Sequence, residues 1–417
     1  MHILYVTHGY KPAYRIGGPV WSVSAAAEGL VSRGHRVTVF APNSNVDEDL
    51  DVPTDREVLV DGVHVRYFRR EEPLKRYLPW FKYLSQSIGF LYTPDLVPVM
   101  RTMLRDIDIV HTQMPFVYPT QAAARLAIAN GTALFYSQRG VFDPSRLRFR
   151  KWKKSVYINL VERPIMRQAT GLVALSLEEV DSFRALGVKT PIHLVPNGID
   201  TARFRRSPRA NSLTELGISP DHLVVLFMAR IHQTKGPDMI VDAFTRIADR
   251  HPAAILVLAG NDEQNLLAGL RARLAEKSLT HRFIAPGMVI GEQKLDLLAR
   301  ADLFVLASVG EGQSMATLEA LASGTPAIVS RECNLPAVAD ANAGAVVART
   351  TEDFAQALSR FLGDPALRRD AGERAYALAR DTFGWAPVLD RLEDIYSSAV
   401  RPAGRAGASL SASSQPR

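Results

Sequence analysis

The chain is poor in cysteine. Its 417 residues include one cysteine, Cys333. A single thiol excludes an intramolecular disulfide, and such low cysteine usage fits a protein of a reducing compartment. A lone thiol without an evident partner is weak evidence for a nucleophile. We therefore expect Cys333 to be an ordinary loop or core residue.

Long apolar runs are also absent. No stretch approaches the roughly 20 apolar residues of a membrane-spanning helix, and the runs 223–229 and 253–259 have the length of strands. The first residues, Met1 to Val6, show no basic segment followed by a long apolar stretch. We interpret them as a first buried strand and not as a signal peptide. A cytoplasmic protein is the expectation.

Several binding signatures are missing as well. The glycine pair Gly17-Gly18 lacks the Gly-x-Gly-x-x-Gly spacing of a dinucleotide site, which counts against a nicotinamide or flavin enzyme. No zinc-ligand spacing, helix-turn-helix pattern or aromatic RNA-binding signature accompanies the basic residues. Nucleic acid is therefore not an expected partner.

Acidic residues are fewer than basic residues, with 43 Asp and Glu against 50 Lys and Arg. The net charge of +7 and the pI of about 9.5 indicate an anionic partner, such as a nucleotide diphosphate or a phospholipid surface. Basic residues concentrate in segment 146–154, where Phe149 and Trp152 interleave with the cations. Two interpretations stay open for this segment. It contacts an anionic membrane, at the inner face of the membrane, or it is a solvated helix face.

The sequence does contain enough apolar residues for large cores. Hydrophobic residues make up 47% of the chain and charged residues 22%, a composition that excludes a disordered protein. A chain of 417 residues exceeds what one hydrophobic core normally supports. We therefore expect two domains.

Strand-like and helix-like segments alternate along the chain, which indicates parallel sheets covered by helices on both faces. The alternation pauses at the loop 196–200 and the basic, polar stretch 203–211, and then restarts. The predicted strands are 3–6, 36–40, 108–111, 133–136, 171–174 and 192–195, followed by 222–229, 254–259, 282–285, 302–306 and 326–329.

This pattern predicts an α/β fold with two doubly wound, Rossmann-like domains, 1–200 and 201–384. The end of the chain, 401–417, is rich in Gly, Ala, Ser and Pro and is predicted to be a disordered tail.

In doubly wound sheets, ligands bind beyond the carboxyl ends of the strands. Gly17-Gly18 follows the first predicted strand, where its backbone N–H groups could approach phosphate or sugar oxygens; a flexible turn is the alternative. Arg230 directly follows strand 222–229, and Lys235 lies five residues later. A guanidinium and an ammonium from one loop suit a diphosphate. Two solvated surface cations are the alternative.

Two carboxylates eight residues apart follow the predicted strand 302–306. Glu311 lies in a glycine-containing loop that would face a bound sugar. Glu319 lies at the edge of the apolar stripe of the next helix, where a carboxylate can accept hydrogen bonds from both hydroxyls of a ribose. A half-exposed helix charge is the alternative. Ser314 is a predicted N-cap, and the free N–H groups after it could receive phosphate or sugar hydroxyls.

These residues carry a family resemblance. Segment 301–330, with its Glu-x7-Glu spacing, resembles the signature of family 4 of the retaining GT-B glycosyltransferases. Arg230 with Lys235-Gly236, the segment 196–200 and Gly17-Gly18 are similar to further motifs of that family in the same order, and the resemblance extends to about residue 399.

The resemblance implies an acceptor-binding first domain and a donor-binding second domain facing each other across a cleft. A C-terminal helix, 385–400, would cross back to the first domain. A nucleotide-sugar donor, retention at the anomeric carbon, and no required metal or cofactor are also implied.

The same resemblance implies roles for single residues. Arg230 and Lys235 would hold the donor diphosphate, and Glu319 would hold the ribose. Met288 would lie near the base, and Glu311 beside the donor sugar. The remaining donor-binding candidates are Gly17, Gly18, Gly312, Gln313, Ser314 and Met315. Glu311, Arg230 and Lys235 are the candidate catalytic residues.

The chain departs from the family pattern at two places. Many relatives have Gly-Phe-Gly or Asn-Phe-Gly after Glu311, where this chain has Gly312-Gln313-Ser314, so the identity of the donor sugar stays open. Relatives often carry a second histidine at Gln113. His111 and Gln113 are candidate sugar contacts, and a His111 that points inward with its hydrogen bonds satisfied is the alternative.

The predicted function is transfer of a sugar from a nucleotide-diphosphate donor to an acceptor. Segment 137–140 resembles a subset of the family that acts in surface or exopolysaccharide assembly, which implies a glycan or lipid-linked acceptor. A sugar-nucleotide epimerase and an inactive nucleotide-sugar-binding subunit are the alternatives. Asp106-Ile107-Asp108 formally matches an Asp-x-Asp metal motif, but it opens an apolar strand, so no metal site is predicted.

Overall fold

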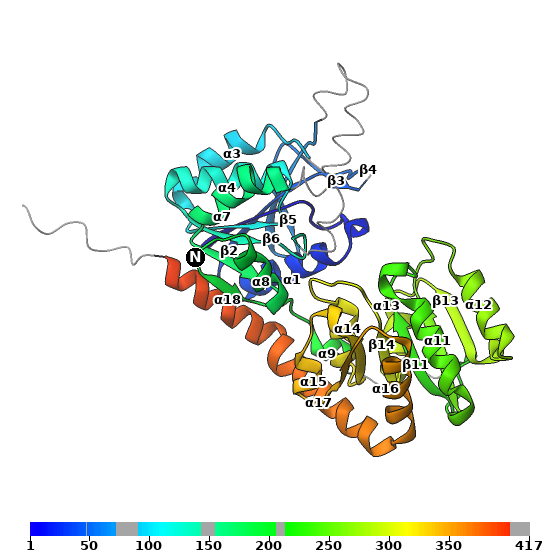
Figure 1. Cartoon of the computed structure of the whole chain (residues 1–417). Coiled ribbons are helices and arrows are strands. Elements are labelled where there is room, and N and C mark those ends of the chain that lie inside the picture. The colour runs from blue at the N-terminus through cyan, green and yellow to red at the C-terminus, as the bar shows by residue number, and fades with distance from the viewer. Residues whose placement is uncertain (47, 72–90, 143–154, 206–212, 401–417) are drawn as a thin grey trace, which may run out of the picture.

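The computed structural model describes residues 1–46, 48–71, 91–142, 155–205 and 213–400. It shows two α/β lobes, and the last helices, α17 and α18 (orange to red), run from the second lobe back along the first (Figure 1). The basic segment 146–154 and the tail 401–417, on each of which a sequence prediction falls, lie outside the described residues.

The first lobe contains an eight-stranded sheet with the order β10-β9-β8-β7-β1-β2-β6-β5. Every neighbouring pair is parallel except the β5–β6 hairpin. The strands are β1 (His2–Thr7), β2 (Arg36–Pro42), β5 (Val58–Val60), β6 (Val63–Phe68), β7 (Ile109–Gln113), β8 (Ala133–Ser137), β9 (Gly171–Ala174) and β10 (Ile192–Leu194). A separate short pair consists of β3 (Ser44–Asn45) and β4 (Glu48–Asp49).

Both faces of this sheet are buried, as a parallel sheet requires. All six residues of β1 are buried, and because side chains alternate along a strand, they divide between two cores. Leu4 and Val6 join a core with α3, α4, α7 and α8. Ile3 and Tyr5 join a second core with α1 and α18. The helices are α1 (Gly18–Ser32), α3 (Leu96–Met103), α4 (Tyr118–Asn130), α7 (Arg163–Gln168) and α8 (Leu177–Ala185).

The second lobe contains a six-stranded, fully parallel sheet with the order β13-β12-β11-β14-β15-β16. Its strands are β11 (Leu223–Met228), β12 (Ala254–Ala259), β13 (Phe283–Gly287), β14 (Leu303–Leu306), β15 (Ala327–Ser330) and β16 (Gly344–Val347). Its helices are α9 (Thr201–Phe204), α11 (Pro237–Ile247), α12 (Leu267–Glu276), α13 (Gly291–Arg300), α14 (Met315–Ala322), α15 (Ala337–Asp340), α16 (Thr351–Gly363) and α17 (Pro365–Phe383).

Local sequence signals explain where many of these helices begin. Proline in the first turn starts α1, α4 and α17, where its missing N–H and fixed φ angle suit a helix N-terminus. Ser314 caps α14 by accepting a hydrogen bond from the N–H of Thr317. Asp364 caps α17 in the same way through the N–H of Leu367.

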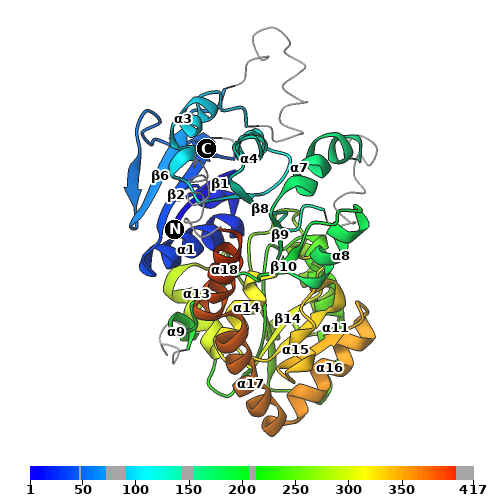
Figure 2. The same cartoon turned by 90° about the vertical axis from the view of Figure 1, so that its left-hand side faces the viewer.

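The C-terminal helix α18 (Trp385–Ala399) belongs to the first lobe by its packing. Leu389, Leu392 and Tyr396 are buried in the same core as β1 and α1, and Tyr396 shares a hydrogen bond with Tyr5. At the chain's first passage between the lobes, Ile199 already lies in the core of the second lobe. Figure 2 shows α18 against the first lobe and α17 against the second.

The predicted fold class is confirmed: both lobes are α/β with parallel sheets covered by helices. All eleven predicted strands are present with ends within two residues. The sequence patterns did not predict β5, β6 or β16, nor the β3–β4 pair. In the described part of the chain, no helix is long and apolar enough to cross a membrane.

Candidate functional site

Each sheet has one point at which the strand order reverses. In the first lobe it lies between β1 and β7, and in the second between β11 and β14. Helices leave such a pair of strands toward opposite faces, so the loops after them diverge and leave a crevice that is the usual ligand site of doubly wound folds. Gly17 and Gln113 lie at the first crevice, and Lys235 and Glu311 at the second.

The glycine pair lies at the start of α1, on the side of the first lobe that faces the second. Gly17 has a φ of +94°, a value that strongly favours glycine. A Cβ atom on Gly18 would lie 3.9 Å from Cγ of Met315, in the first turn of α14. The structure therefore brings together the two helix N-termini that the sequence predicts for donor binding.

Lys235 and Glu311 form the centre of the second-lobe crevice. Lys235 Nζ donates a hydrogen bond to Glu311 Oε1, and the two side chains are only 16% and 11% exposed. The two loops are fixed to each other, because the N–H of Val309 donates to the Thr234 carbonyl at 2.9 Å. Asn334 Nδ2 also donates to the Glu311 carbonyl at 2.9 Å. A cation and a carboxylate are thus held together on a rigid base.

Arg230 does not join them. Its guanidinium donates to Glu263 Oε2 at 2.7 Å, and its side chain is 55% exposed. The sequence interpretation has Arg230 and Lys235 converge on one diphosphate. Of these two cations, the structure places only Lys235 at the crevice. Arg230 would have to leave Glu263 in order to reach a ligand there.

Glu319 is paired as well. Its carboxylate accepts a hydrogen bond from Lys294 Nζ at 2.6 Å, and its side chain is 13% exposed. The alternative of a half-exposed helix charge therefore does not describe this residue. Lys294 lies on α13, and sequence reasoning did not identify it.

Met288 lies between β13 and α13 and is 68% exposed, as is Ile290 two residues later. Both face solvent, and Gly287 before them has a φ of +81°. Exposed apolar side chains on a loop of this kind can cover the face of a nucleobase.

A chain of hydrogen bonds connects the two lobes beside the crevices. The N–H of Asn197 donates to Gln313 Oε1 at 2.6 Å, and Asn197 Oδ1 accepts from Arg139 at 2.8 Å. A Cβ atom on Gly312 would lie 3.2 Å from Cα of Gly140, so glycine permits this close approach. Gln313, at which the chain departs from its relatives, therefore contacts the linker between the lobes.

His111 and Gln113 point into the first lobe. His111 is buried, with Nδ1 at 2.6 Å from the Tyr396 hydroxyl and Nε2 at 2.8 Å from Ser137 Oγ. Burial lowers the pKa of His111 to about 3. Gln113 Oε1 accepts a hydrogen bond from Arg139 Nε at 2.6 Å. The inward, satisfied arrangement is the one that the structure contains for His111.

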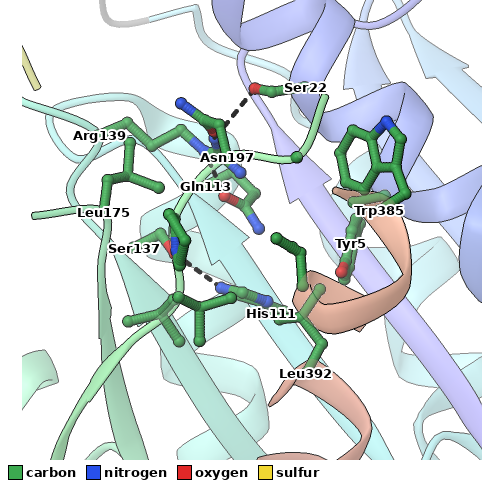
Figure 3. A pocket seen from close by; sticks show the side chains of 16 residues that line it. Tyr5, Ser22, His111, Gln113, Ser137, Arg139, Leu175, Asn197, Trp385 and Leu392 are labelled. Atoms are coloured by element: carbon green, nitrogen blue, oxygen red, sulfur yellow. Dashed lines mark hydrogen bonds between the residues drawn. The ribbon is translucent and has the colours of Figure 1, made fainter. Parts of the chain in front are cut away.

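These side chains line a small cavity of about 20 Å³ between β1, β7, β8, the linker and α18. Figure 3 shows Arg139, Gln113 and Asn197 gathered on one side of it and Trp385 on the other. Such a volume holds about one water molecule. The cavity is therefore part of the junction between the lobes and is too small for a sugar.

Two further sequence predictions concern Cys333 and Asp108. Cys333 is a buried core thiol, and burial raises its pKa to about 11. Asp108 accepts a hydrogen bond from the N–H of His2 at 2.7 Å and so anchors β1. Within the described residues, no group of His, Cys, Asp and Glu side chains has the arrangement of a metal site.

Arg139 is the main site residue that sequence reasoning did not select. It lies two residues after the end of β8, which is the neighbour of crevice strand β7. The available signal resembled that of Arg230, namely a cation in the loop that follows a predicted core strand. The carboxylate of Glu179 accepts hydrogen bonds from the N–H groups of Gly140 and Leu175 and supports this segment.

The two halves of the chain match two family models. Residues 16–203 match the model described as "Glycosyltransferase Family 4", and residues 209–378 match the model described as "Glycosyl transferases group 1". Taken with the fold, these matches support a GT-B glycosyltransferase of the family 4 type.

The curated relatives that the chain matches are also named as glycosyltransferases. D-inositol 3-phosphate glycosyltransferase from Nocardia farcinica is 32% identical over 250 residues, which are 57% of this chain and 55% of the relative. The protein of the same name from Actinosynnema mirum is 31% identical over 57% of this chain and 60% of the relative. The chain thus spans little more than half the length of the curated relatives that it matches.

Solved structures share the whole fold. HepE from Anabaena in complex with UDP and glucose superposes with a TM-score of 0.69 at 18% identity, over 95% of this chain and 100% of that chain. Sucrose-phosphate synthase from Thermosynechococcus elongatus gives 0.68 at 21% identity, over 95% and 98%. A glycosyltransferase from Rickettsia africae gives 0.72 at 16% identity, over 96% and 99%. At these identities the likeness establishes the GT-B fold.

Proposed function

We propose that the protein is a retaining glycosyltransferase that moves a sugar from a nucleoside-diphosphate donor to a hydroxyl of a glycan or lipid-linked acceptor. The pairing of Lys235 with Glu311 between β11 and β14, opposite the glycine pair of the first lobe, carries the proposal. A donor needs a cation for its diphosphate and an acceptor of hydrogen bonds for its sugar hydroxyls, and this crevice supplies both.

In the proposed reaction, the bond between the anomeric carbon and the β-phosphate oxygen breaks through an oxocarbenium-like transition state. The departing diphosphate gathers negative charge, which Lys235 and the N-terminus of α14 would stabilise as preorganised charges. The acceptor oxygen forms the new bond on the face that the phosphate leaves, and its proton passes to that phosphate. No protein nucleophile, metal or other cofactor takes part in this scheme.

The remaining site residues have supporting roles. Glu311 would hold hydroxyls of the donor sugar, and Glu319 the ribose hydroxyls after exchanging its bond with Lys294. Met288 would lie over the base. The likeness to solved structures that contain UDP supports a nucleotide at this position. A role in surface or exopolysaccharide synthesis, at the inner face of the membrane, is part of the proposal and rests on segment 137–140.

A two-stage experiment tests the function. Thermal unfolding is first measured with the glucose and galactose conjugates of uridine, guanosine and adenosine diphosphate, and a selective rise in transition temperature identifies the base. Release of nucleoside diphosphate is then measured with glycan and lipid-linked acceptors. Proton NMR of the product decides between retention and inversion.

Lys235→Ala should lower transfer about 10- to 100-fold, because a charge-assisted hydrogen bond contributes about 1.5–3 kcal/mol and 1.4 kcal/mol is a factor of ten. Lys277→Ala removes an exposed lysine at the end of α12 and should leave the rate unchanged. Unchanged turnover of Lys235→Ala would contradict the site assignment.

The two alternatives give different results in the same assay. A sugar-nucleotide epimerase would convert the donor to a rearranged sugar nucleotide without any acceptor. An inactive binding subunit would show the shift in transition temperature but no turnover with any acceptor. Either result would overturn the proposal.

A further inference from the structure

Arg139 has an unusual environment for a half-buried cation. Its guanidinium donates to Gln113 Oε1 at 2.6 Å, Ser22 Oγ at 3.0 Å and Asn197 Oδ1 at 2.8 Å. All three acceptors are neutral. Among the described residues, no carboxylate forms an ion pair with it, and Nη2 has no hydrogen-bond acceptor.

Glu179 acts on this charge without a direct contact. Glu179 uses both of its oxygens to accept backbone hydrogen bonds, from Gly140 and from Leu175, and burial raises its pKa to about 7. Burial also lowers the pKa of Arg139, but a guanidinium stays protonated at neutral pH. The charge of Glu179 favours the charged guanidinium from beyond ion-pair distance, so Arg139 keeps its charge but forms no ion pair.

The backbone at this position is also constrained. Arg139 has a φ of +49°, in the left-handed region that side chains other than glycine rarely adopt. Such conformations persist only where the surroundings hold them, and they are concentrated at ligand sites. Here the Glu179 carboxylate, bonded to the next N–H, holds the turn and thereby fixes where the guanidinium points.

Arg139 lies next to the proposed donor site. Ser22, one of its partners, lies one turn into α1 after the glycine pair. Asn197, another partner, donates to Gln313 in the loop that follows Glu311. Gly140 meets Gly312 of that same loop. The cation thus lies beside the contact between the first lobe and the proposed donor-sugar loop.

We propose that Arg139 is a phosphate-binding residue of the first lobe, and that its Nη2 group receives a phosphate of a substrate bound in the cleft. This inference rests on the proposed function. A guanidinium that forms no ion pair and keeps a free Nη2 group favours an anion over a neutral sugar hydroxyl. The phosphate belongs either to the donor diphosphate or to a phosphorylated acceptor.

Three variants separate this role from a structural one. Arg139→Gln removes the charge. Gln113→Glu introduces an internal carboxylate 2.6 Å from Nε, which neutralises the guanidinium while it preserves the hydrogen bond that holds the fold. Asn130→Asp adds the same negative charge at an exposed position at the far end of α4 and serves as the matched control.

Binding is measured by calorimetry in two arms, on the full chain and at two salt concentrations. The first arm titrates UDP, GDP or ADP, whichever raises the transition temperature. The second titrates inorganic phosphate into protein saturated with that nucleotide. If the donor supplies the phosphate, Arg139→Gln and Gln113→Glu lower affinity about tenfold or more in the first arm. If the acceptor supplies it, they do so only in the second arm.

Gln113→Glu should unfold at or above the wild-type temperature, so it reports on binding even if Arg139→Gln does not fold. Wild-type affinity of Gln113→Glu in both arms would overturn the Arg139 assignment, and the proposed function would still stand if Lys235→Ala lost nucleotide binding. Absence of nucleotide binding by the wild-type protein would instead overturn the proposed function.

Discussion

At the scale of single residues, Lys235 and Glu311 each limit which other groups their partner can bind. The ammonium and the carboxylate share a hydrogen bond in a crevice where both are largely buried. Under the proposed function, a donor diphosphate would compete with Glu311 for Lys235, and the carboxylate released by this exchange would become an acceptor for sugar hydroxyls. Binding of the two ends of the donor would then be linked through one internal bond.

His111 should make the first lobe sensitive to acid. Its pKa in the fold is about 3, whereas an exposed histidine titrates near 6.5. Between these values the unfolded chain binds a proton that the folded chain does not, so the free energy of unfolding falls as the pH drops below about 6.5. The loss approaches about 1.4 kcal/mol per pH unit within this window.

His111→Gln should therefore lose less stability than the wild type between pH 6.5 and 4.5. Urea denaturation at both pH values, followed by circular dichroism, measures the difference. His64→Gln, at an exposed position on β6, is the control and should follow the wild-type trend. Parallel losses in His111→Gln and the wild type would show that the fold does not lower the pKa of this imidazole.

The crevice residues illustrate how far sequence reasoning reaches at this scale. Lys235 and Glu311 could be predicted together because their loops follow adjacent parallel strands. The pairing of Arg230 with Glu263 could not, because the direction of an exposed side chain depends on a partner 33 residues away in another loop. Arg139 was overlooked because its lack of an ion-pair partner becomes visible only in three dimensions.

At the scale of elements, the loop after β11 is built to lie against β14. Gly236 has a φ of +67°, and a Cβ atom there would lie 2.4 Å from the carbonyl oxygen of Ala307. Only glycine lets the loop that carries Lys235 pack this closely on the strand that leads to Glu311. The backbone thus sets the distance between the two side chains of the site.

Gly236→Ala should destabilise the second lobe by at least about 1–2 kcal/mol, from the left-handed φ alone, and the contact with Ala307 adds to this. Thermal unfolding measures the effect. Gly269→Ala in α12 is the matched control, since a Cβ atom there meets nothing within 4 Å, and alanine in a helix is favoured over glycine by about 0.5–1 kcal/mol. Equal transition temperatures for both variants would contradict the packing argument.

The elements that the sequence patterns did not predict lie toward sheet edges or outside the main sheets. β5 and β6 form an antiparallel hairpin at the edge of the first sheet, and β16 is the edge strand of the second. All four residues of β16 are only partly buried. Central strands are recognisable as continuous apolar runs. In contrast, β6 interrupts its apolar residues with His64 and Arg66, and β5 and β16 are only three and four residues long.

At the scale of the whole molecule, α18 is a covering helix for a sheet whose first strand stands at the other end of the sequence. Gly29 of α1 approaches Leu389 so closely that a Cβ atom would lie 2.6 Å from Cδ1. Arg33 adds ion pairs to Asp390 and Glu393. The interface between α1 and α18 therefore combines close apolar packing with ion pairs at its edge.

Leu389→Ala should destabilise the first lobe by about 2–5 kcal/mol, the usual loss for a buried leucine. Hydrogen exchange detected by mass spectrometry should show faster exchange in β1 and β2 and unchanged exchange in β11 and β12. Ser397→Ala, at an exposed position on the same helix, is the control. Faster exchange confined to the second lobe would show that α18 stabilises a different unit.

The position of α18 has a consequence for synthesis on the ribosome. The sheet of the first lobe can form early, but one of its apolar faces, which includes Tyr5, is only partly covered by α1 until Leu392 and Tyr396 have been translated. The whole second lobe is made in between. A nascent chain of this protein therefore exposes part of an apolar sheet face for most of its elongation. Chaperones that bind unfolded chains would bind this face until the last helix emerges.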